Sequence, residues 1–217
     1  MLVSMAPERI IVEGYFDDPA RLSPQDLELF RRNIHPENRY ALALADTLRI
    51  RAAGGDLPSN RLARAALSQG FALEDVVGTH IVRLLAGQPS DGRVAAVEAL
   101  VRRDLEGIFP NGFNFHEWYS RRIGEAPSDA GVRRIYRGPC GSGIIAEIAS
   151  FQSETRNNHL LSIIATGLGE GARVAAVFGA NHLYSLFDPL ARSATKMDII
   201  TPAELPEIST QEPYPVT

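Results

Sequence analysis

The sequence has a single cysteine and no long hydrophobic run. That cysteine, Cys140, excludes a framework of intramolecular disulfides and is typical of a protein from a reducing compartment. No apolar stretch approaches the roughly 20 residues that a membrane-spanning helix needs, and no signal-peptide pattern opens the chain. Basic residues do not outnumber acidic ones, and the formal net charge is −4. We therefore predict a cytoplasmic protein that has no membrane span and no nucleic-acid partner.

The sequence does contain enough apolar residues for one sizeable core. Its 217 residues are 45% hydrophobic and 22% charged, which is the composition of a globular domain. We predict a single α/β domain over residues 1–205, with a helical insert at about residues 19–140. Residues 206–217 are rich in proline and are expected to form an extended or disordered tail.

Three short apolar segments predict strands. Arg9–Val12 is apolar and is closed by Glu13 and a glycine. Val174–Phe178 is a continuous apolar run, typical of a strand that is covered on both faces, and Met197–Thr201 is a last short strand. The predicted fold class is α/β, with a small, mostly parallel sheet and a large helical insertion. We expect the first two strands to be neighbours, directly or across one strand.

Most of the remaining chain has the periodicity of helices, several of them ended by glycine. The predicted helices are Pro24–Asn33, Pro36–Arg51, Asn60–Gln69, Leu73–Leu85, Asp91–Glu106, Phe113–Arg122, a long helix from Glu147 to Gly167, and Leu183–Ala191. Val132–Gly143 is expected to be a loop that enters the long helix. His80 is expected to be a packed or surface histidine, and Trp118 a buried anchor.

Two polar features adjoin the predicted strands. The long helix is mostly apolar but carries a polar patch, residues 154–159, and His182 follows the turn at Gly179 after the strand 174–178. In open α/β sheets, ligands bind beyond the carboxyl ends of the strands, which is where Glu13 and His182 fall. Because adjacent strands lie about 4.8 Å apart, we expect these two side chains to converge. The alternatives are a backbone cap for Glu13 and a hydrogen bond to a carbonyl for His182.

Three motifs follow one another along the chain: an Arg-Asn-x-His-Leu segment on a helix, an apolar strand ending in Gly-x-x-His, and a Pro-Leu pair. The residues are Arg156, Asn157, His159, Leu160, Gly179, His182, Pro189 and Leu190. This order resembles the TraB/Tiki superfamily, with its erythromycin-esterase and ChaN-like relatives. Phe115–Tyr119 also resembles an aromatic Phe-x-x-Trp-Tyr segment of its bacterial members.

The resemblance implies a hydrolase-type site that acts on a small molecule or peptide and is assisted by a divalent metal in the Tiki branch. The implied catalytic residues are Glu13, Glu154, Arg156 and His182, the implied substrate-binding residues are Asn157, Asn181 and Gly179, and the implied metal ligands are Glu13 and His182. Arg156 would neutralise an anionic substrate or transition state. The alternative is a structural ion pair of Arg156 with Glu13 or Glu154.

The chain departs from the family in its first histidine motif. In the family, a strand and a Gly-x-x-His precede the glutamate strand, and neither stands before Glu13 here. Val77–His80 looks similar but lies later, inside a predicted helix. A truncated chain, a misassigned start and a reduced variant all stay open. We expect an exposed sheet edge beside residues 9–14 or 174–179, filled by self-association or by the tail.

Two other functions stay open. One is a non-catalytic relative of the same fold that binds a small molecule or a partner. The other is a Toprim-like nucleotide-handling domain, because residues 11–17 resemble the Glu-Gly-Tyr-x-Asp run of that family. Toprim domains hold magnesium with a later Asp-x-Asp at a strand end, and the strand that ends at Phe178 lacks this motif.

Overall fold

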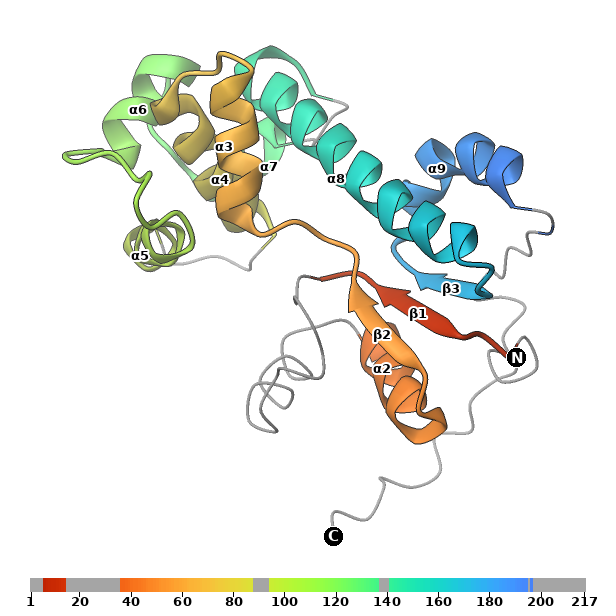
Figure 1. Cartoon of the computed structure of the whole chain (residues 1–217). Helices are drawn as coiled ribbons and strands as arrows, with labels where there is room; N and C mark the ends of the chain where they lie inside the picture. The colour runs from red at the N-terminus through yellow and green to blue at the C-terminus, as the bar shows by residue number, and fades with distance from the viewer. Residues whose placement is uncertain (1–5, 15–35, 88–93, 137–140, 195, 197–217) are drawn as a thin grey trace, which may run out of the picture.

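The centre of the structure is a sheet of three parallel strands (Figure 1). The computed structural model describes residues 6–14, 36–87, 94–136, 141–194 and 196. The strands are β1 (Arg9–Val12), β2 (Arg51–Gly54) and β3 (Val174–Val177), in the order β2-β1-β3. The helices are α2 (Pro36–Leu48), α3 (Ser59–Ser68), α4 (Leu73–Ala86), α5 (Val94–Asp104), α6 (Phe115–Ile123), α7 (Asp129–Ile135), α8 (Gly143–Gly169) and α9 (Ala180–Ser193). The predicted α/β fold with a small parallel sheet is confirmed, and β1 and β3 are direct neighbours.

Each face of the sheet packs on its own helices. Successive side chains of a strand point to opposite faces, so Ile10 and Val12 share one face and Ile11 lies on the other. Ile10 and Val12 form a core with α2, whereas Ile11 packs with Leu160 of α8 and Leu186 of α9. The three β1 side chains are fully buried. β1 is therefore the best protected strand, and its carboxyl end is held firmly.

The helices α3 to α7 pack into a second core away from the sheet (Figure 1). Its centre is aromatic, because Phe115, Trp118 and Tyr119 of α6 are buried, with ring centroids 5.6 to 6.5 Å apart. The indole Nε1 of Trp118 donates to Asp75 of α4 at 2.9 Å, and Arg122 Nε donates to the same carboxylate at 2.7 Å. This confirms Trp118 as a buried anchor.

The long helix α8 connects the two cores. Its first part places Ile145 and Ile148 in the core of the helical region, and its later part places Leu160 and Ile164 over the sheet. Figure 1 shows α8 running from the α3–α7 cluster to β3 and α9. The polar patch, residues 154–159, occupies the middle of the helix, where one core gives way to the other. The patch therefore lies at the level of the junction at which the strands end, and part of it faces that junction.

The structure corrects the prediction for the segment before the helical region. The helix expected over Pro36–Arg51 ends at Leu48, and residues 51–54 form β2, which pairs with β1 along its length. The expected helical insert thus contains a strand of the sheet, and β1 is flanked on both sides rather than exposed. Among the described residues, β2 and β3 each pair on one side only. Ala176 is exposed, so β3 is not covered on both faces as its apolar run predicted.

A second correction concerns the loop expected at Val132–Gly143. Residues 129–135 form α7, because the side chain of Ser128 caps the helix by accepting the N–H of Gly131. The helices predicted over the α3, α4, α5, α6 and α9 segments are confirmed within a few residues. The helix expected at 24–33, the strand at 197–201 and the tail at 206–217 lie outside the described residues. Within the described part, no helix is long and apolar enough to cross a membrane.

Candidate functional site at the carboxyl ends of the strands

The parallel register brings polar groups together where the strands end. Glu13 directly follows β1, and its N–H donates to the carbonyl of Val177 in β3 at 3.0 Å. Asp56 follows β2 and forms two hydrogen bonds with Gly14, each 3.1 Å long. The Asp56 N–H donates to the Gly14 carbonyl, and the Asp56 Oδ2 accepts the Gly14 N–H. Glu13 Oε2 accepts the N–H of Gly179, the N-cap residue of α9, at 3.2 Å. Each carboxylate is therefore positioned by the backbone that follows a neighbouring strand.

The guanidinium of Arg156, on α8, joins these two carboxylates. Its Nε and Nη2 donate to the two oxygens of Asp56 at 2.7 and 2.8 Å, which is a bidentate pair. Nη2 also lies 3.4 Å from Glu13 Oε1. Burial alone would lower the pKa of Arg156, but the hydrogen bonds and charges of Asp56 and Glu13 outweigh it and raise the pKa. Among the described residues, no protein group accepts a hydrogen bond from Nη1.

His182, in the first turn of α9, completes the cluster. Its Nδ1 lies 2.7 Å from Oδ1 of Asn157, on α8. An amide oxygen only accepts, so Nδ1 carries the proton and Nε2 keeps its lone pair. Burial and the charge of Arg156 lower the pKa of His182, and the carboxylates of Glu13 and Asp56 oppose this shift. The imidazole is therefore neutral near pH 7 and presents an unprotonated Nε2.

A glycine under the cluster allows α8 and the strand ends to approach closely. A Cβ at Gly55 would overlap the ring of Phe178, and would lie 2.9 Å from Leu160 Cδ1 and 3.0 Å from Ile11 Cγ2. These contacts are tighter than a packed interior tolerates, so a side chain here would push α8 away from the sheet. The glycine thus permits the short distance between Asp56 and the α8 guanidinium.

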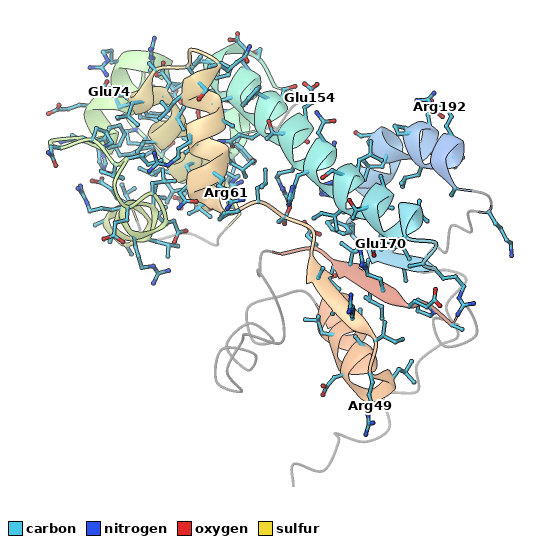
Figure 2. The ribbon with its side chains drawn as sticks, in the orientation of Figure 1. Arg49, Arg61, Glu74, Glu154, Glu170 and Arg192 are labelled. Carbon is cyan, nitrogen blue, oxygen red and sulfur yellow. The ribbon has the colours of Figure 1, made fainter. Side chains whose placement is uncertain are left out.

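The structure brings most of the predicted site residues together and separates one. The residues in the cluster are Glu13, Arg156, Asn157, Gly179 and His182. Glu154 is exposed, on the side of α8 that points away from the sheet (Figure 2), and it forms no ion pair with Arg156. The side chain of Asn181 lies outside what the structure describes. Of the two alternatives for the Arg156 ion pair, Glu13 is thus a partner, although the main partner is Asp56.

Asp56 is the site residue that sequence reasoning missed. It follows the glycines at 54 and 55, just as a polar residue and a glycine follow the other two strands. That signal was hidden because the residues before it were assigned to a helix. His159, one turn after Arg156 on α8, belongs to the same surroundings: burial lowers its pKa, and the nearby charge of Asp56 opposes that shift.

These residues do not fit the divalent metal that the family resemblance implies. Both carboxylates contact Arg156, so a metal ion would have to displace a guanidinium that holds Asp56 with two hydrogen bonds. Catalytic zinc sites typically use three protein ligands. In the described part of the chain, no three His, Cys, Asp or Glu side chains gather in a way that could hold a metal ion.

Comparisons of the chain with models of protein families, with curated proteins and with solved structures gave no match. The candidate site therefore rests on its own geometry, and the TraB/Tiki resemblance stays a prediction.

Proposed function

We propose that this chain is a hydrolase-type domain, of the kind the TraB/Tiki resemblance implies, with its active site at the carboxyl ends of β1, β2 and β3. The observation that carries the proposal is the hydrogen bond between His182 Nδ1 and Asn157, beside the ion pairs of Arg156 with Asp56 and Glu13. A histidine held by a neighbouring amide, with its other nitrogen unprotonated, is the arrangement that general-base catalysis requires.

The residues divide the chemistry between them. Nε2 of His182 takes a proton from a water molecule, whose oxygen attacks the carbonyl carbon of the substrate. The tetrahedral intermediate then breaks its bond to the alcohol or amine leaving group, which takes the proton back from the imidazolium. Asn157 holds the imidazole in the required tautomer and is a positioning residue. Arg156 stabilises the negative charge that develops on the substrate oxygen. Its Nη1 donates to no acceptor among the described residues, and its side chain is partly shielded from water, at 24% exposure. Glu13 and Asp56 hold the guanidinium in place.

A non-catalytic form is the alternative, and one observation favours it. Arg156, on α8, forms ion pairs with Asp56 and Glu13 at the strand ends, which is also how a structural ion pair ties a helix to a sheet. Such a protein would bind a small molecule or a partner at the carboxyl ends of the strands without hydrolysing it. The Toprim-like alternative gains no support from the site, because β3 is followed by Phe178 and Gly179 and not by a carboxylate.

The test is hydrolysis of a panel of carboxylic esters, lactones and amides, with product release followed directly. His182→Ala is expected to lower kcat by about 10²-fold or more, which is the usual contribution of a general base. His116→Ala is the matched control, because His116 is exposed on α6, away from the sheet. Equal rates for the two variants, or no hydrolysis of any panel member, would favour the non-catalytic form.

A further inference from the structure

A pocket of about 430 Å³ opens beside the Arg156 cluster, between the sheet and the helical region. Asp56 and Arg156 line one side of it, and Arg83 of α4 and Asp104 of α5 line another. The first residues of α3, 58–60, form a further wall. Its volume lies in the range of pockets that hold small molecules. The pocket thus joins two elements of the helical region to the ends of the strands.

Arg83 is the pocket cation that forms no ion pair with a carboxylate in the described part of the chain. Its Nη2 lies 3.3 Å from Nδ1 and 3.5 Å from Nε2 of His80, and among the described residues no carboxylate lies within ion-pair distance of it. His80 does not neutralise the charge, because burial and Arg83 lower the pKa of His80 to about 3 and keep the ring neutral. Burial likewise lowers the pKa of Arg83. A partly buried guanidinium without a counter-ion is costly unless an anion reaches it.

The other charged side chains that line the pocket are Asp56, Asp104 and Arg156. Arg156 and Asp56 neutralise each other through their bidentate pair. Asp104 exerts the smallest of the electrostatic effects on Arg83, and its nearest cation is Arg103, at 3.6 Å. Arg83 therefore places its positive charge on the α4 side of the pocket, which the start of α3 also lines.

The start of α3 adds backbone donors to the same space. Its N-cap residue is Pro58, which supplies no side-chain cap. The N–H groups of Arg61 and Leu62 donate to the Pro58 carbonyl, but within the described part of the chain no protein acceptor meets the N–H of Ser59 or Asn60. Free amides at a helix N-terminus attract anions, and phosphate groups above all.

We propose that this pocket binds the phosphate group of a small phosphorylated molecule. Arg83 neutralises the phosphate, the N–H groups of Ser59 and Asn60 bind its oxygens, and Nη1 of Arg156 faces the rest of the ligand. As a binding site, the pocket does not depend on catalysis. If the pocket is a substrate site, the inference rests on the proposed function, and the substrate class is a small phosphorylated compound.

The experiment is an amide-resolved NMR titration of the full chain with inorganic phosphate. Saturable shifts are expected at Ser59, Asn60 and the Arg83 side chain. Arg83→Gln is expected to weaken binding about tenfold or more, which is the value of one charge-assisted hydrogen bond. Arg64→Gln makes the same change of charge on an exposed position of α3 outside the pocket, and should leave binding within about twofold.

A second variant guards against an effect of Arg83 on folding. Ser59→Pro removes one of the proposed amide donors while keeping every charge, and proline is well tolerated at the first position of a helix. It is expected to weaken phosphate binding severalfold with an unchanged urea midpoint. No saturable shifts with phosphate, equal affinities for Arg83→Gln and Arg64→Gln, or tighter binding of acetate than of phosphate would each overturn the proposal. Phosphate binding without any hydrolysis would count against the proposed function alone.

Discussion

Replacing Arg156 by glutamine removes the group that ties α8 to the ends of two strands. The glutamine keeps part of the stem but leaves Asp56, whose side chain is only 15% exposed, with the Gly14 N–H as its one remaining donor among the described residues. Exposed ion pairs contribute about 0.2 to 1 kcal/mol, and breaking a fully buried pair costs about 3 to 5 kcal/mol. With side-chain exposures of 24% and 15%, this pair lies between those cases. We expect Arg156→Gln to lower the free energy of unfolding by about 2 kcal/mol.

The structure also predicts how this loss divides between the two carboxylates. Asp56 receives two hydrogen bonds, at 2.7 and 2.8 Å, whereas Glu13 receives one long contact of 3.4 Å. Double-mutant cycles by urea unfolding at pH 7 should therefore give a coupling energy of about 1.5 kcal/mol with Asp56→Asn and below about 0.5 kcal/mol with Glu13→Gln. Equal coupling to both, or additivity within about 0.5 kcal/mol for the Asp56 cycle, would refute the reasoning.

Two further predictions concern the helical region. A Cβ at Gly78 would overlap the buried indole of Trp118, so Gly78→Ala should lower the free energy of unfolding in urea by about 3 kcal/mol. Gly169→Ala is the control, because a Cβ at this last residue of α8 would lie in open space, and it should be neutral or slightly stabilising. Equal effects of the two substitutions would contradict this packing. Because the pKa of His80 is lowered from 6.5 to about 3, the unfolded chain takes up this proton first, and stability is lost as pH falls from 6.5 toward 3. The loss of free energy of unfolding approaches roughly 4 to 5 kcal/mol near pH 3, and His80→Gln should flatten the dependence of stability on pH in this range. Parallel profiles of stability against pH for the two proteins would contradict it.

The strands of the sheet show what the sequence could and could not predict. β1 and β3 were predictable, because Ile10, Ile11 and the run 174–177 are apolar and glycine follows soon after each strand. β2 was not, because Arg51-Ala-Ala-Gly has no β-branched or aromatic residue and alanine favours helix. Its extended conformation comes from pairing with β1, which is a tertiary interaction that local propensity does not contain.

The candidate site follows the same division. Glu13 and His182 were predictable from the rule that ligands bind beyond the carboxyl ends of parallel strands. Asp56 was not predictable as a site residue because β2 was not predictable, and an acidic residue after an unrecognised strand looks like part of a loop. Glu154 was misplaced because it lies two residues before Arg156, and each helical residue turns the chain by about 100°, which puts the two side chains on opposite sides of α8.

The most direct test of the central claim is the titration of the His182 imidazole, followed by nitrogen-detected NMR from pH 4 to 9. The account predicts a ring with its proton on Nδ1, hydrogen-bonded to Asn157, and a pKa below the ordinary value of 6.5. Arg156→Gln should raise that pKa, because it removes a cation and leaves the carboxylates of Glu13 and Asp56 to favour the charged ring. A ring protonated on Nε2, or a His182 pKa above 6.5 that Arg156→Gln does not change, would contradict the claim that this cluster holds a neutral base.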